Sequence, residues 1–227
     1  MLTINNLSVS YGNKVVLSKL SFHADHQMIH GVVGYNGAGK TTLLNAIYGI
    51  PRKFEEIKMD GTILGRSSVS YLDSGQYFYP YISGRDYLKM FSARNPSFEY
   101  ESLCRLFNVP IDNFVDTYSD GMKKKLAIVA TLALKKDVIM MDEPFNGLDL
   151  ESVFLLQLAL KSIASKGNTV IITSHIMESL IPLCDTISVL KDGIISKTYA
   201  SSEYASLKEE MHGRLESEYG SVVEKIL

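Results

Sequence analysis

Residues 34–41 of the 227-residue chain read G-Y-N-G-A-G-K-T and match the phosphate-loop pattern G-x-x-x-x-G-K-[ST]. In such a loop the backbone N–H groups turn inward and surround phosphate oxygens at the start of a helix. Lys40 would reach the β- and γ-phosphates of a nucleotide, and the Thr41 hydroxyl would bind Mg²⁺. The pattern therefore predicts a nucleotide-binding site.

The residues on both sides of this loop support the prediction. Ile29, Val32 and Val33 form a short apolar run, as a buried strand before the loop would. After the loop, apolar side chains recur on one helical face from Leu43 to Ile47, and Gly49 is placed to end that helix. The loop therefore has the strand before it and the helix after it that phosphate binding requires.

Two acids follow a second apolar run. Residues 138–141 are continuously apolar, which indicates a strand buried on both faces of a parallel sheet. Asp142 at the tip of that strand is suited to hold Mg²⁺, usually through water, and Glu143 is suited to polarise an attacking water. Strands often end in exposed acids, so the pair gains its meaning from its position downstream of the phosphate loop and before Pro-Phe-Asn-Gly-Leu-Asp.

Two further residues have the chemistry to touch a terminal phosphate. Ser119 is placed to cap an apolar helix predicted over residues 126–134, and its hydroxyl could grip a γ-phosphate together with the flexible Gly121. His175 follows the apolar strand predicted over residues 169–173 and could orient a water. Taken alone, Ser119 is more simply explained as an ordinary helix cap, and His175 as a structural histidine.

In this order the motifs resemble the ATP-binding cassette (ABC) family, the nucleotide-binding subunits of ABC transporters, across nearly all of residues 1–200. The resemblance implies that Tyr11 stacks on the adenine of ATP. It assigns the phosphates of ATP to Gly34, Asn36, Gly37, Ala38, Gly39, Lys40, Thr41 and Thr42. It makes Ser119 and Gly121 part of the signature that grips the ATP of a second subunit, and it places Asp149 in the loop that couples the two sites.

The same resemblance implies which residues catalyse hydrolysis and which hold the metal. Lys40 neutralises phosphate charge, while Glu143 and His175 align the attacking water. The Mg²⁺ contacts are assigned to Thr41, Asp142 and Gln76.

The chain departs from the family pattern at two places. The signature reads Y-S-D-G-M where the family has L-S-G-G-Q, so Asp120 brings a negative charge near a phosphate site. The lysines at 123–125 either offset that charge or form a solvated helix face. In the glutamine loop an ungapped fit places Ser74 at the glutamine's position, with Gln76 two residues later, and the sequence leaves open which of them serves.

These elements predict an α/β fold, a P-loop NTPase core with a mainly parallel sheet, and a single ABC ATPase domain over residues 1–227. The core comprises residues 1–80 and 119–200, and it includes an antiparallel β subdomain with strands at 2–11 and 14–24. Two short strands around a turn at Gly65 are expected between residues 61 and 72. A small helical insert is expected at 81–118, a hairpin turned at Asp192-Gly193, and a helical extension at 201–227 with Leu207, Met211 and Leu215 in one stripe.

Composition narrows the function classes. The net charge of −2 lacks the basic excess typical of nucleic-acid binding, so no nucleic-acid partner is expected. Apolar runs stay far short of the roughly 20 residues that span a bilayer, and no signal peptide is expected. Cys104 and Cys184 predict free thiols in a reduced cytosolic protein.

His23, His26 and His30 have a spacing that could suit zinc on a helix, but the segment indicates a strand and turn, so surface or hairpin histidines are expected.

The resemblance implies an Mg-dependent ATPase that closes with a second cassette, identical or different, around ATP. Such a dimer drives separate membrane-spanning permease subunits, which would place the chain on the cytoplasmic face of the membrane. The short helical insert, with the loop at 74–79, is the expected docking surface, and together with the lack of a long C-terminal domain it favours an exporter. Two alternatives stay open, a soluble ATP-driven clamp and a low-turnover cassette of a heterodimer.

Overall fold

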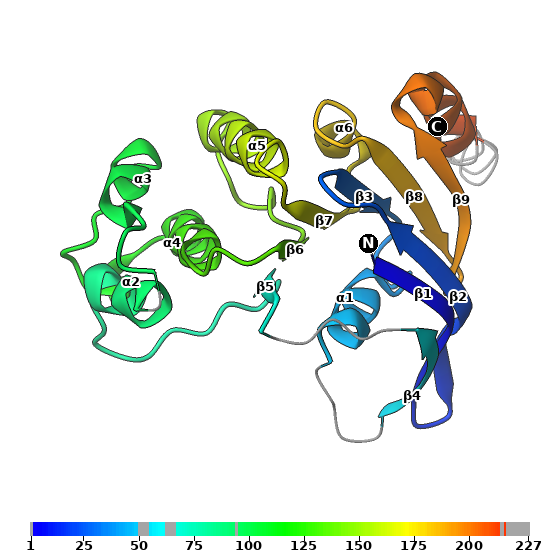
Figure 1. Ribbon diagram of the computed structural model, residues 1–227, viewed down its shortest axis with the longest axis horizontal. Coiled ribbons are helices and arrows are strands. Elements are labelled where there is room, and N and C mark those ends of the chain that lie inside the picture. The colour runs from blue at the N-terminus through cyan, green and yellow to red at the C-terminus, as the bar shows by residue number, and fades with distance from the viewer. Residues whose placement is uncertain (1, 50–54, 62–66, 94, 214–215, 217–227) are drawn as a thin grey trace, which may run out of the picture.

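A computed structural model of the chain describes residues 2–49, 55–61, 67–93, 95–213 and 216 (Figure 1). A six-stranded sheet forms its centre. The strand order is β5-β6-β7-β3-β8-β9, all parallel except β9, which pairs antiparallel with β8. The strands are β5 Val69–Leu72, β6 Val138–Asp142, β7 Thr169–Ser174, β3 Ile29–Val33, β8 Thr186–Lys191 and β9 Ile194–Ala200. The predicted α/β fold with a mainly parallel sheet is confirmed.

A second, antiparallel sheet forms the predicted β subdomain. Its strand order is β2-β1-β4, with β1 at Leu2–Tyr11, β2 at Lys14–Ala24 and β4 at Glu55–Gly61. The prediction of two neighbouring short strands between residues 61 and 72 is wrong in part. One strand ends at Gly61 and belongs to this sheet, whereas β5 belongs to the central sheet; the expected turn at Gly65 lies outside the described residues. Each strand is paired by segments distant in sequence, which short-range patterns do not reveal.

Helices cover the two faces of the central sheet differently. Helix α1, Lys40–Tyr48, contacts β6 and β7 on the face toward the antiparallel sheet, and helices α5, Leu150–Ala164, and α6, Met177–Leu180, contact β3 and β7 on the other face (Figure 1). Consecutive side chains of β7 pack on opposite faces of the central sheet. Ile171 belongs to the apolar cluster with α1, and Ile172 belongs to the cluster with α5 and α6. Strands buried on both faces read as continuous apolar runs for this reason.

The helical segments between β5 and β6 gather at the end of the molecule remote from β1 and β2 (Figure 1). They are α2 at Gly84–Ser92, α3 at Tyr100–Leu106, the 3₁₀ turn η1 at Val115–Thr117 and α4 at Asp120–Ala133. Helix α4 packs against α2, α3 and β5, so it joins this helical group to the sheet. The helices predicted within 81–118 are therefore present, and α4 extends the group.

Two helices and one hairpin begin, end or turn at the residues that the sequence predicted. Ser119 accepts the backbone N–H of Met122 at 3.3 Å and caps α4, and Gly49 ends α1 in the left-handed region with φ 69°. Asp192 and Gly193 turn the β8–β9 hairpin with φ values of 49° and 78°.

After β9 come the short 3₁₀ turn η2, Ser201–Glu203, and a helix over residues 204–213. Leu207 and Met211 of that helix are buried in the main core, as the predicted stripe requires. The third residue of the stripe, Leu215, lies outside the described residues.

Candidate functional site

The phosphate loop lies between β3 and α1, at the carboxyl end of the central strand. Glycines are needed here because side chains would collide. A Cβ at Gly34 would lie 2.5 Å from the carbonyl oxygen of Leu190, and one at Gly39, whose φ is 106°, would lie 2.7 Å from a Leu17 methyl carbon. The loop therefore brings its backbone N–H groups to the start of α1, where a helix favours anions.

Lys40 is the first residue of α1 and is only 6% exposed. Its Nζ donates to the carbonyl oxygens of Gly34 at 2.8 Å and Tyr35 at 3.3 Å, and it forms an ion pair with Glu143 Oε1 at 3.2 Å. The ammonium is thus held inside the loop and directed at the end of β6. A cation in this position can neutralise phosphate charge.

Asp142 is fully buried at the end of β6 and is held from two sides. The Thr41 hydroxyl donates to Oδ2 at 2.6 Å, and the Thr173 hydroxyl donates to Oδ1 at 2.5 Å. The oxygens of Thr41 and Asp142 therefore lie together beside the phosphate loop. Hard oxygen donors of this kind, one of them charged, fit Mg²⁺, which binds proteins through one or two carboxylates and completes its shell with water and phosphate.

Glu143 follows directly and has a backbone φ of 48°, in the left-handed region that is costly for a residue with a side chain. Its N–H donates to the carbonyl oxygen and to the hydroxyl of Thr173, both at 3.2 Å. Its Oε2 lies 2.9 Å from His175 Nδ1 and accepts the His175 backbone N–H at 3.2 Å. The structure therefore brings together Lys40, Glu143 and His175, as the sequence predicted.

A cavity of about 320 Å³ opens over the phosphate loop. Its lining residues come from β2, the phosphate loop, α1, the segment after β5 and the end of β6: Val16, Asn36, Gly37, Gly39, Lys40, Thr41, Thr42, Ser74, Asp142 and Glu143. Most of the predicted phosphate-binding set is in this lining. Tyr11 lies beside it, with its hydroxyl 3.4 Å from Thr42 Oγ1.

Two residues of this site were not singled out from the sequence. Val16 on β2 borders the cavity, and Thr173 holds both Asp142 and the backbone of Glu143. Thr173 sits at the tip of β7, directly opposite Asp142 in the parallel register. A hydroxyl residue ending the strand beside the acidic one was the available signal, but strand order was needed to use it.

The glutamine loop presents Ser74 and Gln76 differently. Ser74 borders the cavity over the phosphate loop, and both residues border a neighbouring cavity of about 180 Å³ together with Glu143. Ser74 donates to Asp73 Oδ1 at 3.3 Å, and Gln76 Nε2 donates to the Asp73 carbonyl oxygen at 3.1 Å. Ser74, and not the predicted Gln76, therefore borders the cavity that Thr41 and Asp142 also line.

The signature residues lie apart from the phosphate loop of the same chain. Ser119 and Gly121 begin α4, and within the described part of the chain neither they nor Asp149 line the cavity over that loop. A Cβ at Gly121 would lie 2.9 Å from the carbonyl oxygen of Gly147, so α4 and the loop at 146–149 approach closely. The predicted contact of Ser119, Gly121 and Asp149 with ATP therefore does not follow from the lining of this cavity.

The charged residues of the signature helix face in different directions. Asp120 is exposed and borders cavities on the side of Gln76. Lys125 donates to Asp149 Oδ2 at 2.7 Å, and this bond, with the Ser152 N–H, holds the pKa of Asp149 well below its usual value. Lys124 is only 6% exposed, so the solvated face considered for residues 123–125 is wrong at this position.

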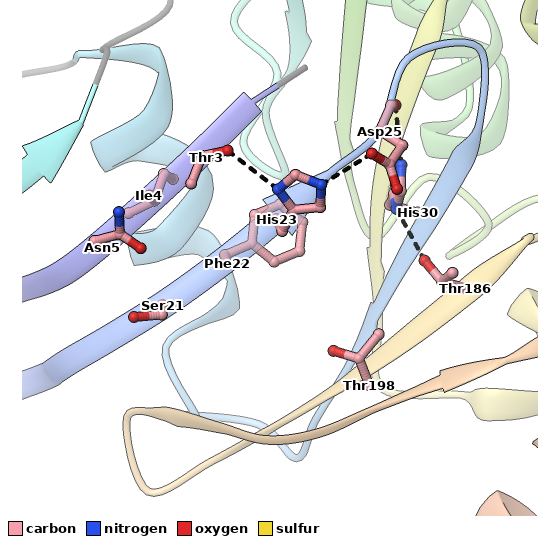
Figure 2. Close-up of a pocket in the computed structure, with 10 residues that line it drawn as sticks. All are labelled: Thr3, Ile4, Asn5, Ser21, Phe22, His23, Asp25, His30, Thr186 and Thr198. Atoms are coloured by element: carbon pink, nitrogen blue, oxygen red, sulfur yellow. Dashed lines mark hydrogen bonds and ion pairs between the residues drawn. The ribbon is translucent and has the colours of Figure 1, made fainter.

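The three histidines do not converge on one point. Figure 2 shows His23 between Thr3 and Asp25, at 3.1 and 2.9 Å, beside a pocket of about 310 Å³. His30 Nδ1 lies 2.8 Å from Thr186 Oγ1, and Nε2 lies 3.1 Å from the Asp25 carbonyl oxygen. His30 is 3% exposed, which corrects the expectation of a surface histidine, and burial lowers its pKa. Among the described residues, no group of three or more His, Cys, Asp or Glu side chains is placed to hold a metal ion.

Comparison with known proteins gave consistent matches. The sequence pattern of the family described as ABC transporter matches residues 17–146. The lantibiotic transport ATP-binding protein SrtF of Streptococcus pyogenes is 30% identical over 213 residues, covering 89% of this chain and 93% of SrtF. The linearmycin resistance ATP-binding protein LnrL of Bacillus subtilis is 30% identical over 209 residues, covering 85% of this chain and 67% of LnrL.

A solved structure has the same fold. It is described as an ATP-binding subunit of an ABC transporter, and it superposes with a TM-score of 0.79 at 24% sequence identity, covering 94% of this chain and 93% of that one. Among the described residues, no helix has the length and apolar character needed to cross a membrane.

Proposed function

This chain belongs to the ABC transporter family as an ATP-binding subunit, and on that premise we propose that it hydrolyses Mg²⁺-bound ATP to drive transport through separate membrane subunits. One observation carries the proposal. The groups that bind phosphate, hold metal and activate water lie at adjacent positions around one cavity, joined by the Lys40–Glu143 ion pair at 3.2 Å and the Thr41–Asp142 hydrogen bond at 2.6 Å.

Each residue has a distinct part in hydrolysis. Lys40 binds the β- and γ-phosphates, and the N–H groups of the phosphate loop surround them. Glu143 accepts a hydrogen bond from the attacking water and takes up its proton as the new bond to the γ-phosphorus forms and the bond from that phosphorus to the bridging oxygen of the leaving ADP breaks. His175, in contact with the Glu143 carboxylate, keeps that carboxylate directed at the water. Mg²⁺, held by Thr41 and Asp142, would spread the negative charge that develops on the phosphates.

The site is proposed to be completed by a second cassette, identical or different. Ser119 and Gly121 stand at the start of α4, where a helix N-terminus favours a phosphate, and neither lines the cavity over the phosphate loop of its own chain. A head-to-tail pair would bring the start of α4 of each chain over the ATP of the other. Asp149, tied to α4 through Lys125, would then lie between the two sites.

A membrane partner is proposed to dock on the exposed aromatic loop before α2. Tyr77, Tyr79 and Tyr81 are 70%, 53% and 83% exposed, whereas Phe78 is fixed by ring contact with Tyr87 at 4.9 Å between centroids. Exposed aromatic side chains on a fixed support are typical of protein interfaces. Docking there would hold the chain at the cytoplasmic face of a membrane, next to the glutamine loop.

The direction of transport is proposed to be export. The names of the relatives describe lantibiotic transport, linearmycin resistance and, for a protein of Paraburkholderia xenovorans that is 31% identical over 201 residues, Nod factor export. The small helical group formed by α2 and α3 agrees with that direction by analogy of fold.

Steady-state hydrolysis by the purified chain tests the proposal. We expect Mg²⁺-dependent release of phosphate from ATP that chelation with EDTA abolishes. We expect Lys40→Ala to lose nucleotide affinity in calorimetry, because the buried ammonium is the principal cation facing the phosphates. Unchanged ATP affinity in that variant would count against the assigned site.

A further inference from the structure

Lys125 on α4 is paired with Asp149 at the start of α5. Its Nζ donates to Asp149 Oδ2 at 2.7 Å, and its side chain is only 12% exposed. Helix α4 packs against α2, α3 and β5, whereas α5 packs against β3 and β7, and the two helices lie next to one another (Figure 1). The ion pair therefore ties together two helices that are anchored on different strands.

Asp149 uses both oxygens of its carboxylate. Oδ2 accepts the hydrogen bond from Lys125, and Oδ1 accepts the Ser152 N–H at 2.8 Å, which caps α5. Because each bond involves a charged group, each is stronger than a hydrogen bond between neutral groups. The Asp149 side chain is thereby fixed against α4 and α5 at once, although it is 58% exposed.

A second contact joins the same elements one helix turn earlier. A Cβ at Gly121 would lie 2.9 Å from the carbonyl oxygen of Gly147, so the loop at 146–149 approaches the backbone of α4 closely. Gly121 and Lys125 are four residues apart and therefore share one face of the helix. The loop is thus held against that face at two points, by a backbone contact at Gly121 and by an ion pair at Lys125.

The two elements that are joined in this way have one feature in common. In the proposed head-to-tail pair, both the start of α4 and the loop at 146–149 face the second cassette. Surface segments that move independently each lose freedom when they are ordered on association, and this loss weakens binding. Segments that are already fixed against each other lose less.

We propose that Lys125 is a positioning residue that holds Asp149 and the start of α4 in one fixed arrangement, which the second cassette meets as a single surface when ATP closes the pair. The inference rests on the proposed function, because it needs a second cassette. Within the described part of the chain, neither Lys125 nor Asp149 lines the cavity over the phosphate loop. Loss of Lys125 therefore weakens the dimer and the turnover within it, and leaves ATP binding by a single chain intact.

The test measures the ATP-dependent dimer in the Glu143→Gln background, in which ATP persists. We expect Lys125→Met to raise the dimer dissociation constant about tenfold in analytical ultracentrifugation with ATP and Mg²⁺, within the range that couplings between sites span. Lys125→Arg restores it to within about threefold, because the charge and a donor return. The control is Lys89→Met, which removes an ion pair with Asp86 at 3.1 Å on α2 and leaves the dimer unchanged.

A double-mutant cycle assigns the effect to the ion pair itself. Asparagine at 149 can still cap α5, but it loses the charge that pairs with Lys125. If the pair is the device, Lys125→Met adds no further loss to Asp149→Asn, because the partner is already gone. Losses that multiply in the double variant show that Lys125 acts independently of Asp149, and they overturn the inference.

Two further measurements separate positioning from folding and from ATP binding. With Glu143 present, Lys125→Met lowers kcat about tenfold, while the ATP affinity of the monomer, measured at protein concentrations below the dimer dissociation constant, stays within about twofold of wild type. The Tm falls by no more than about 4 °C, as the loss of one partly exposed ion pair does. A loss of dimer that follows the unfolded fraction and is not restored by arginine overturns the inference.

The parent variant tells the two levels of the account apart. If Glu143→Gln forms no dimer with ATP, the proposed paired site fails, and the role of Lys125 fails with it. If Glu143→Gln forms the dimer and the added Lys125→Met leaves its dissociation constant unchanged, the paired site stands and the role of Lys125 alone is refuted.

Discussion

Asp142 and Glu143 depend on a hydroxyl that no motif names. Thr173 donates to Asp142 at 2.5 Å and accepts the N–H of Glu143 at 3.2 Å, so one side chain fixes both the metal-binding acid and the backbone of the proposed general base. That backbone has a φ of 48°, and such strain persists only where the surroundings over-determine it. At the scale of residues, the site is therefore organised from β7 as much as from the phosphate loop.

Replacing Thr173 by valine tests this role. Valine keeps the shape of the side chain and its preference for strands, but leaves the fully buried Asp142 without one of its donors. We expect a loss of unfolding free energy of about 1–3 kcal/mol and a kcat reduced at least tenfold. Urea denaturation and steady-state hydrolysis measure the two effects. A variant with unchanged stability and turnover would show that Thr41 alone suffices to hold Asp142.

His30 gives the fold a dependence on pH. Burial lowers its pKa from 6.5, although the nearby Asp25 and Asp185 act in the opposite sense. The folded chain therefore favours neutral His30, and the unfolded chain binds more protons as the pH falls below 6.5. The stability linked to His30 is fully present above that pH and is lost as the pH falls through the lowered folded-state pKa.

Melting curves at two pH values check this expectation. Wild type should lose more Tm between pH 7 and pH 5.5 than His30→Phe, which cannot be protonated at this position. An equal loss in both proteins would assign the acid sensitivity to other groups.

At the scale of elements, one kind of cap serves two purposes. Ser83 caps α2 by accepting the Asp86 N–H at 3.1 Å, and Ser119 caps α4 by accepting the Met122 N–H at 3.3 Å. Removal of either hydroxyl should cost about 0.5–2 kcal/mol of stability. If the start of α4 also grips the ATP of a second subunit, only the Ser119 variant should in addition lose ATP-dependent dimerisation.

The two alanine variants form a matched pair. We expect Ser83→Ala and Ser119→Ala to melt at similar temperatures, while Ser119→Ala alone weakens ATP-dependent dimerisation. Analytical ultracentrifugation with ATP measures the dimer. Equal dimerisation of the two variants would reduce Ser119 to an ordinary helix cap.

Elements with strong local signals could be predicted from the sequence, and contacts between distant segments could not. The Ser119 cap, the Asp192-Gly193 hairpin and the acids at the end of β6 follow from patterns a few residues long. The assignment of β5 to the central sheet depends on its pairing with β6, about 70 residues later, and the burial of Lys124 depends on acids from two other elements. Patterns a few residues long therefore predict neither the pairing of β5 nor the burial of Lys124.

At the scale of the whole molecule, the proposed function divides the ATP site between two regions of the described chain. The cavity over the phosphate loop is lined by Lys40 and Glu143, two of the proposed catalytic residues, and the start of α4, with Ser119 and Gly121, is not part of that lining. In the proposed head-to-tail pair, the start of α4 of each chain would complete the site over the phosphate loop of the other. Closure on ATP and opening after hydrolysis would then move whatever is docked at the tyrosines before α2.

The measurement that tests this account most directly is the mass and turnover of Glu143→Gln in the presence of ATP and Mg²⁺. The amide keeps the size of the side chain but cannot take up the proton of water. We predict that the variant binds ATP with wild-type affinity, accumulates as a dimer by light scattering and releases no phosphate. Hydrolysis at the wild-type rate, or a protein that stays monomeric with ATP bound, would contradict a shared site in which Glu143 is the general base.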